Sequence, residues 1–263
     1  MTVGSDKIIT LTGLTKIFGD FKAVDDISLE VGRGEIFGFL GPNGAGKTTT
    51  IKMLAGLLKP DRGQILIGNT DLEVDPEKCK YQTGYIPDRP FLYEKLTGEE
   101  FLQFIASLYQ LPVELYNERV PEFFKLFDLT DWRHHLIESY SHGMRQKLII
   151  TSAFILEPPL IVVDEPMIGL DPKSAKIVKE LFKKHARNGG SIFLSTHSLE
   201  IAEELCDRIA IIMNGKIKCI GNMASLRREA SLENSGLEDI FLELTGAHEL
   251  QAIIHALRQK ENE

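Results

Sequence analysis

The chain has 263 residues, of which 43% are apolar, so it can bury a sizeable core in one large domain or in a core with subdomains. Its formal net charge of −8 argues against a surface for nucleic acid. The three cysteines lack paired metal-ligand spacing, and their odd number fits a reducing compartment. We find no signal peptide and no apolar run long enough to cross a bilayer, so a membrane role would need a partner that spans.

The first part of the chain predicts antiparallel strands. Residues 8–31 alternate between apolar and polar in short pieces, with predicted turns at Gly13, at Gly19-Asp20 and at Gly32. Phe18 lies beside the second turn. From composition alone it is interpreted as a core aromatic, and the alternative is a ring that stacks on a nucleotide base.

A glycine-rich run follows the next predicted strand, residues 36–40. Gly41 to Thr48 reads Gly-Pro-Asn-Gly-Ala-Gly-Lys-Thr and matches the phosphate-binding pattern G-x-x-x-x-G-K-[ST]. Such a loop aims its backbone N–H groups and the N-terminus of the next helix at one point. Lys47 is expected to reach the β- and γ-phosphates, and the Thr48 hydroxyl to ligate Mg²⁺. A helix is predicted after the loop from the spacing of Ile51, Leu54, Ala55 and Leu58.

Strands are predicted at residues 64–67 and 83–87, and a helical insertion at about 88–155. Most apolar residues early in this insertion are expected to fill its own core, while a few could line a groove for a partner's helix: Phe91, Leu92, Tyr93, Leu96 and Phe101. His134 and His135 have no further ligand at metal spacing, so we interpret them as surface residues.

A second helix start with features of a phosphate site lies within the insertion. Ser141 precedes the apolar run 148–156 and is predicted to be an N-cap. Gly143 in the first turn disfavours helix, and it is explained if a ligand approaches closely there. A helix N-terminus with a serine and a glycine is a second possible phosphate site.

Two adjacent acids end a strongly apolar strand. Residues 160–163 are consecutive β-formers, which predicts a strand buried on both faces of a parallel sheet. Asp164 is expected to hold Mg²⁺, directly or through water, and Glu165 to take a proton from an attacking water. The alternative is that both are ordinary acids at the end of a strand, which the P-loop in the same chain disfavours.

The remaining elements follow from local signals. Asp171 is predicted to cap a helix with Pro172 at its first position. His197 follows the predicted strand 191–195, and we interpret it as a sensor of the γ-phosphate because ligands bind at the carboxyl ends of such strands. A hairpin is predicted around Asn214-Gly215. The tail is predicted to be helical, with an amphipathic stripe at Ala247, Leu250, Ile253, Ile254 and Leu257.

This ordered set of motifs resembles the ATP-binding subunit of an ABC transporter. The resemblance covers about residues 8–221 and includes the P-loop lysine, a signature-like motif at residues 141–146, a Walker B pair, a D-loop at residues 169–171 and a switch histidine. The tail segment 237–246 is similar to the exporter-type branch, which includes drug, polysaccharide and sodium efflux systems.

The resemblance implies an α/β P-loop NTPase of the ABC ATPase type, with an N-terminal antiparallel β subdomain and an inserted α-helical subdomain. It implies an ATP-binding domain over residues 1–221 and a helical tail over 222–263. It also reverses the interpretation of Phe18, which falls where the family's adenine-stacking aromatic lies. The implied ATP-binding set is Phe18, Gly41, Pro42, Asn43, Gly44, Ala45, Gly46, Lys47, Thr48, Thr49, Ser141 and Gly143.

Two positions depart from the family pattern. Asp88 stands where the family usually has a glutamine that contacts the metal and reports to the membrane subunit, and contact through water stays feasible for an aspartate. The implied metal set is therefore Thr48, Asp164 and Asp88. The signature motif usually reads Leu-Ser-Gly-Gly-Gln; here Tyr140, His142 and Met144 replace three of the five residues.

The family resemblance implies a head-to-tail dimer, either of two copies or of this chain with a related subunit. Each ATP would lie between the P-loop of one copy and Ser141 and Gly143 of the other, with Asp171 at the contact between the copies. Integral membrane permease subunits would be the further partners, which places the chain on the cytoplasmic face of the cell membrane. Glu165, His197 and Lys47 would be catalytic, and ATP and Mg²⁺ the cofactors.

Two other functions are weighed against this one. The first is a soluble ABC ATPase in cofactor assembly or in chromosome or ribosome work, although such proteins often carry two cassettes or long coiled coils, which this chain lacks. The second is a regulator that binds nucleotide without hydrolysis, which the presence of both Lys47 and Glu165 disfavours.

Overall fold

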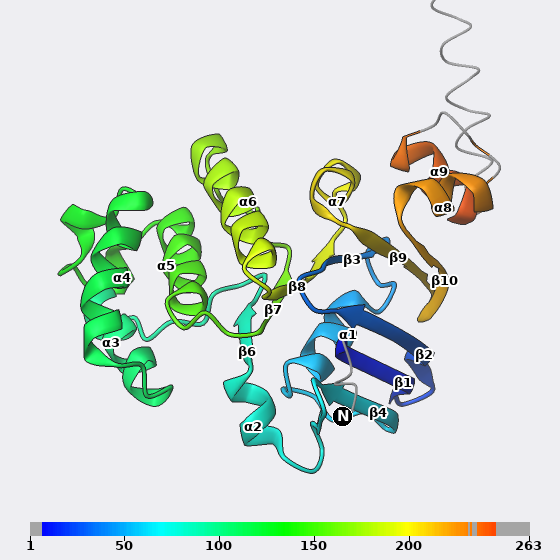
Figure 1. Cartoon of the computed structure of the whole chain (residues 1–263), viewed down its shortest axis with the longest axis horizontal. Coiled ribbons are helices and arrows are strands. Elements are labelled where there is room, and N and C mark those ends of the chain that lie inside the picture. Colours follow the sequence, from blue (N-terminus) through cyan, green and yellow to red (C-terminus); the bar gives the residue numbers. More distant parts are fainter. Residues whose placement is uncertain (1–6, 231, 233–235, 246–263) are drawn as a thin grey trace, which may run out of the picture.

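The computed structural model describes residues 7–230, 232 and 236–245. Its N-terminal sheet is antiparallel and has the strand order β2-β1-β4-β5 (Figure 1). Its strands are β1 Lys7–Phe18, β2 Phe21–Gly32, β4 Arg62–Ile67 and β5 Thr70–Asp71. The antiparallel strands predicted for residues 8–31 are therefore confirmed.

The predicted turn at Gly13 is wrong, because β1 runs through this residue to Phe18. Gly13 has φ +60 and lies where the pairing of β1 with β2 shifts between Leu11 and Leu14. A glycine with positive φ accommodates such a bulge without breaking the strand. The glycine therefore marks an irregularity within the strand and does not end it.

The second sheet has the order β10-β9-β3-β8-β7-β6, and its strands are parallel except β10. Every residue of β3, β7 and β8 is buried, as both faces of a covered parallel sheet require. The strands are β3 Ile36–Leu40, β6 Thr83–Ile86, β7 Leu160–Asp164, β8 Ser191–Thr196, β9 Arg208–Met213 and β10 Lys216–Gly221.

The carboxyl ends of three neighbouring strands position the site. The strands β3, β8 and β7 are adjacent and parallel, so the segments that follow Leu40, Thr196 and Asp164 emerge at the same edge of the sheet. Stacked aromatic rings fix β3 against β8, with ring centroids 5.7 Å apart for Phe37 and Phe193.

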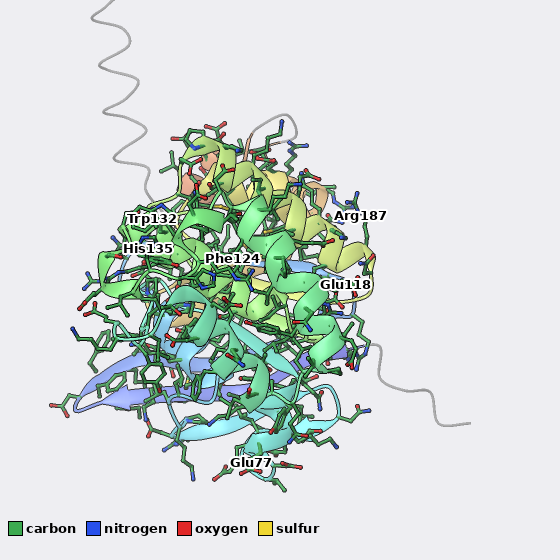
Figure 2. All side chains as sticks on the ribbon, turned by 90° about the vertical axis from the view of Figure 1, so that its left-hand side faces the viewer. Glu77, Glu118, Phe124, Trp132, His135 and Arg187 are labelled. Atoms are coloured by element: carbon green, nitrogen blue, oxygen red, sulfur yellow. The ribbon has the colours of Figure 1, made fainter. Side chains whose placement is uncertain are left out.

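The inserted helical layer lies between β6 and β7 in the chain. Its helices are α3 Gly98–Leu108, α4 Val113–Leu126 and α5 His142–Phe154, with short 3-10 turns at Thr130–Trp132 and Ile137–Ser139. In Figure 2, which views the molecule from this side, Phe124 lies within the layer and Trp132 and His135 lie toward its rim. Phe101, Leu102, Val120 and Phe124 of these helices are buried in the core.

The early part of the insertion is divided between core and surface. Phe101 is buried, whereas 88% of Phe91 and 60% of Tyr93 are exposed. His134 is also exposed, with its Nδ1 3.1 Å from a carboxylate oxygen of Glu99, which confirms its interpretation as a surface residue. The exposed aromatics are consistent with both interpretations of this stretch, since only some of its members enter the core.

Helix α1 spans Lys47–Leu54 and is shorter than the apolar spacing predicted. Gly56 has φ +67, and beyond it the N–H groups of Leu57 and Leu58 both donate to the Lys52 carbonyl, at 2.8 and 3.1 Å. This is the hydrogen-bonding pattern of a helix C-terminus closed by a left-handed glycine. The apolar Leu58 therefore packs beside the helix without belonging to it.

The remaining helices surround the two sheets. They are α2 Pro76–Tyr81, α6 Pro172–Arg187, α7 Leu199–Leu205, α8 Met223–Glu229 and α9 Leu237–Thr245. The Asn214-Gly215 hairpin is confirmed, with φ of +50 and +75 at its two turn residues. The predicted stripe from Ala247 to Leu257 lies outside the described residues. Among the helices of the described part, none is both long and apolar enough to cross a bilayer.

Candidate nucleotide site

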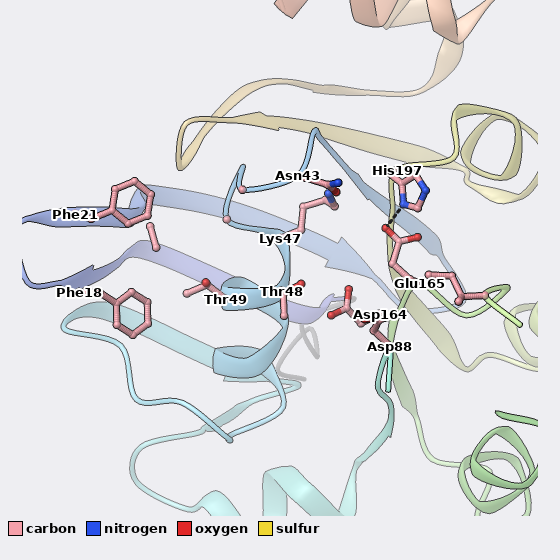
Figure 3. Close-up of a pocket in the computed structure, with 14 residues that line it drawn as sticks. Phe18, Phe21, Asn43, Lys47, Thr48, Thr49, Asp88, Asp164, Glu165 and His197 are labelled. Atoms are coloured by element: carbon pink, nitrogen blue, oxygen red, sulfur yellow. Dashed lines mark hydrogen bonds and ion pairs between the residues drawn. The ribbon is translucent and has the colours of Figure 1, made fainter. Parts of the chain in front are cut away.

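A cavity of about 470 Å³ opens at the carboxyl ends of β3, β7 and β8 (Figure 3). It combines aromatic rings from the antiparallel sheet, the glycine-rich loop and carboxylates from the parallel sheet. Its lining residues are Phe18, Phe21, Ala23, Asn43, Gly44, Gly46, Lys47, Thr48, Thr49, Asp88, Asp164, Glu165, Ile168 and His197.

The start of α1 is left open toward this cavity. Gly46 is the N-cap with φ +108, and no side chain accepts a hydrogen bond from the first turn. A Cβ at Gly46 would collide with the Ala23 carbonyl, so only glycine fits there. The N–H groups at this helix start, together with the partial positive charge of the N-terminus, suit an anion.

Lys47 lies at the floor of the cavity with only 7% of its surface exposed. Its Nζ donates to the carbonyls of Gly41 at 2.6 Å and Pro42 at 3.1 Å, which hold the ammonium under the loop. Burial lowers the pKa of Lys47, and the charges of Glu165 and Asp164 oppose that shift. The lysine is thus the cationic group on this side of the cavity, facing the carboxylates on the other.

Asp164 is 2% exposed, and its Oδ1 makes no hydrogen bond within the described part of the chain. Burial raises the pKa of Asp164, the nearby hydroxyls of Ser195 and Thr48 counteract the rise, and the charges of Glu165 and Asp88 add to it. A buried carboxylate oxygen without a partner calls for an explanation, and a bound cation provides one.

The same carboxylates act on a neighbouring phenol. Burial, followed by the charges of Asp164 and Asp88, raises the pKa of Tyr85 on β6 to about 12. The phenol therefore stays neutral at physiological pH, and the negative charge of this wall belongs to the two aspartates.

Glu165 is held in a fixed orientation at the end of β7. Its φ is +50, which is uncommon for a residue with a side chain, and its N–H donates to the Ser195 carbonyl at 3.0 Å. Its Oε1 lies 2.7 Å from Nδ1 of His197, and its Oε2 accepts from the Thr196 hydroxyl at 3.2 Å. Figure 3 shows this carboxylate and the His197 ring at the cavity. The arrangement suits a group that orients a water molecule.

Two phenylalanines stand at the mouth of the cavity. Phe18 is 49% exposed and Phe21 is 63% exposed, and they pair across the β1–β2 turn. The interpretation of Phe18 as a core residue, made from composition alone, is therefore wrong, because its ring faces the cavity from the rim. Phe21 was missed, although its position opposite Phe18 across a predicted two-residue turn is a signal that could have found it.

The start of α5 lies outside this cavity. Ser141 caps the helix and accepts from the Met144 N–H at 3.3 Å, which confirms the predicted cap. A Cβ at Gly143 would lie 2.7 Å from the Gly169 carbonyl, so the close approach that requires a glycine comes from the chain's own backbone. Within one copy, Ser141 and Gly143 do not meet the P-loop.

Asp171 also lies apart from the cavity and has a structural role. It caps α6, accepting from the Ser174 N–H at 2.9 Å and hydroxyl at 2.6 Å, as predicted. The Ser174 hydroxyl, the Ser174 N–H and Lys147 together lower the pKa of Asp171. The Lys147 Nζ is 3.1 Å from the Asp171 carboxylate, which ties α5 to the start of α6.

The candidate metal ligands do not form a preassembled metal centre. Thr48, Asp88 and Asp164 all line the cavity, but no group of three or more His, Cys, Asp or Glu in the described ranges is arranged to hold a metal. Two carboxylates and a hydroxyl leave several positions around Mg²⁺ to be filled by phosphate oxygens and water.

Comparisons with known proteins agree with this geometry. A family model described as ABC transporter matches residues 24–168. The chain is 35% identical over 238 residues to the ABC-type transporter ATP-binding protein EcsA of Bacillus subtilis (strain 168), covering 90% of this chain and 96% of EcsA. It is 35% identical over 225 residues to the daunorubicin resistance ATP-binding protein DrrA3 of Streptomyces coeruleorubidus, covering 86% and 71%. A solved structure of an ATP-binding subunit of an ABC transporter is 38% identical, with a TM-score of 0.88 and coverage of 90% and 99%.

Proposed function

The chain belongs to the ABC transporter family as an ATP-binding, ATP-hydrolysing subunit, and on that premise we propose that it powers export through separate membrane-spanning subunits. The predicted fold class is thereby confirmed. One observation carries the proposal: a single cavity joins an open helix start, a buried aspartate with one unpartnered oxygen and an oriented glutamate. Export is supported by the resemblance of the tail segment and by the similarity to a drug resistance protein.

We assign the binding roles from the positions in the cavity. The loop from Gly41 to Thr49 would hold the phosphates through its N–H groups and Lys47, and Phe18 would stack on the adenine. Thr48, Asp164 and Asp88 would hold Mg²⁺, and the unpartnered Oδ1 of Asp164 fits this role. When bound, the metal neutralises phosphate charge.

Glu165 would take the proton from the attacking water. Its two oxygens are already held by His197 and Thr196, so the carboxylate presents one orientation to the phosphate side of the cavity. His197 contacts Glu165 through Nδ1 and is 58% exposed, so its other ring nitrogen would be available to the γ-phosphate, which suits the sensor role. Lys47 would stabilise the charge that develops on the phosphate oxygens.

The site would be completed by a second copy or a related subunit. Ser141 and Gly143 lie at a helix start outside the cavity, so within one chain they have no nucleotide to contact. A head-to-tail pair would bring them to the partner's ATP and place Asp171 near the contact between the copies. ATP would then bridge two surfaces, and hydrolysis would remove the bridging charges.

Membrane-spanning subunits would dock on the helical insertion. The exposed rings of Phe91 and Tyr93, which follow the cavity-lining Asp88 in the chain, offer an apolar contact. The chain would then sit on the cytoplasmic face of the membrane. We assign residues 1–221 to the ATP-binding domain and 222–263 to the tail.

The test is purification of the tagged chain from detergent-solubilised membranes of its own cells, followed by phosphate release with ATP. A transporter subunit should recover a protein with several membrane spans and hydrolyse ATP. Recovery of soluble partners alone, with active ATPase, would favour the soluble alternative. Nucleotide binding without any phosphate release would favour a regulator.

A further inference from the structure

The charges around the cavity are unbalanced against a bare nucleotide. The carboxylates of Asp88, Asp164 and Glu165 line it, and the one ammonium among its lining residues is that of Lys47. Metal-free ATP carries several negative charges on its phosphates. The cavity that would bind it therefore carries more negative than positive charge of its own.

Two of these carboxylates cannot move away from a bound phosphate chain. Asp164 is 2% exposed and ends the buried strand β7. Glu165 is fixed by hydrogen bonds to His197 and Thr196. Asp164 is buried and the Glu165 side chain is only 15% exposed, and such charges are screened by salt much less than exposed ones.

Asp88 is the third carboxylate that lines the cavity. It follows β6, whose neighbour in the sheet is β7, and its charge acts on Asp164 across the same wall. Its own carboxylate makes no hydrogen bond or ion pair with the rest of the described chain. Asp88 therefore adds a negative charge to the cavity lining without a hydrogen-bond or ion-pair partner in the described chain.

We infer that Asp88 makes this cavity select metal-complexed ATP and reject metal-free ATP. The inference rests on the proposed function and concerns which form of the nucleotide can enter. Asp164, through its unpartnered Oδ1, and Asp88 would hold a divalent cation, whose positive charge would offset their repulsion of the phosphates. Without the cation, Asp88 repels the phosphate chain.

The test compares nucleotide affinity with and without magnesium. Binding of a non-hydrolysable ATP analogue is measured by isothermal titration calorimetry in excess Mg²⁺ and in EDTA. Because the analogue itself prevents hydrolysis, Glu165 need not be replaced and keeps its charge. For the wild type, removal of the metal should weaken binding by at least about tenfold, the order expected for fixed charges at short range in a partly buried site. In Asp88→Asn, this ratio should fall about tenfold, mainly through tighter metal-free binding.

Further variants separate charge from shape. Asp88→Gln should behave like Asp88→Asn, and Asp88→Glu should keep the wild-type ratio. Asp131→Asn is the matched control, because Asp131 is an exposed acid outside the cavity, and it should leave the ratio unchanged. Thermal unfolding of each variant establishes that it is folded.

The inference is overturned if Asp88→Asn leaves the ratio at the wild-type value or widens it, or if Asp88→Glu behaves like Asp88→Asn. A wild-type chain that binds the analogue equally in Mg²⁺ and in EDTA also overturns it. Absence of nucleotide binding under every condition would instead refute the proposed function, so the two failures can be told apart.

Discussion

The N-terminus of α1 and the N-terminus of α5 both present backbone N–H groups, but they differ in what satisfies those groups. The first has a glycine cap, no capping side chain and a buried lysine, and it opens into a cavity lined by acids. The second is capped by its own Ser141 and lies at the surface, outside that cavity. The first start is open to a ligand, whereas Gly143 in the first turn of the second packs against the carbonyl of Gly169 in the same chain.

From this contrast we expect the two helix starts to contribute unequally to phosphate binding. Under the proposed function, the α1 start would bind nucleotide within one chain. The α5 start, which lies outside the cavity, would contribute only where another copy brings its nucleotide to it. Substitutions at the first should therefore change binding or chemistry directly, and substitutions at the second should change only what depends on pairing.

The largest effect is expected at the α1 cavity for Glu165→Gln. Loss of a general base typically costs about 10²- to 10⁴-fold in rate, so steady-state phosphate release should fall by at least about 100-fold. The glutamine keeps the shape, and we expect ATP affinity to be retained and the ATP-bound dimer to be stabilised. Unchanged turnover of a purified complex would contradict the role of Glu165.

Lys47→Met should weaken ATP binding by about 100-fold. The substitution removes a buried charge from beneath the phosphates and leaves a side chain of similar length, and hydrogen bonds to charged groups contribute about 1.5–3 kcal/mol. Calorimetry with ATP and magnesium measures the change. A variant that binds as well as the wild type would show that the loop amides suffice without the ammonium.

Ser141→Arg should separate the two helix starts. We expect ATP affinity of the single chain to stay within about twofold, because Ser141 does not line the cavity, while turnover falls by at least about tenfold through loss of the paired state. Ser141→Ala is the control for the lost cap, which costs about 1 kcal/mol of stability. Equal turnover in Ser141→Arg and wild type would show that the α5 start takes no part in ATP hydrolysis.

The smallest effect concerns Asp171, which ties α5 to α6. Asp171→Ala loses the cap and the ion pair with Lys147 and should lower the free energy of unfolding by about 1 kcal/mol. Asp171→Asn keeps one acceptor oxygen for the cap and loses the second, which accepts from the Ser174 hydroxyl and pairs with Lys147. The half-exposed ion pair is worth about 0–1 kcal/mol. Chemical denaturation at neutral pH measures both.

The lowered pKa of Asp171 determines how its contribution to the free energy of unfolding changes with pH. Because the pKa of Asp171 is lowered in the folded state, its contribution is complete above the ordinary value of 3.8 and is lost as the pH falls below it toward the lowered value. The stability difference between wild type and Asp171→Asn should therefore shrink on acidification below about pH 4. A difference that grows in acid would contradict the assignment.

Much of the fold follows from local sequence signals, because buried strands and capped helices carry them. The runs at residues 36–40 and 160–163 contain no polar side chain, and Asp171-Pro172 is an unambiguous helix start. The bulge at Gly13 and the early end of α1 were missed. In both cases a glycine with positive φ acts through backbone pairing that the sequence pattern does not specify.

The site could be predicted where its residues belong to a contiguous motif. Asn43, Lys47, Thr48 and Asp164 are recognised by spacing, and they line the cavity as expected. Phe21, Ala23 and Ile168 line it too. Ala23 and Ile168 carry no polar group or motif, so only the fold identifies them, whereas Phe21 could have been inferred from its position opposite Phe18. The unpartnered oxygen of Asp164 and the positive φ of Glu165 are likewise properties of three-dimensional packing.

Mixing two inactive chains tests the composite site most directly. Lys47→Met leaves the α5 start intact, and Ser141→Arg leaves the α1 cavity intact, so a mixed dimer contains one complete site. At equal amounts, with the two sites acting independently, phosphate release should recover to about a quarter of the wild-type rate. If the mixture never exceeds the average of the two variants while crosslinking shows that mixed pairs form, ATP is not shared between copies and the account is contradicted.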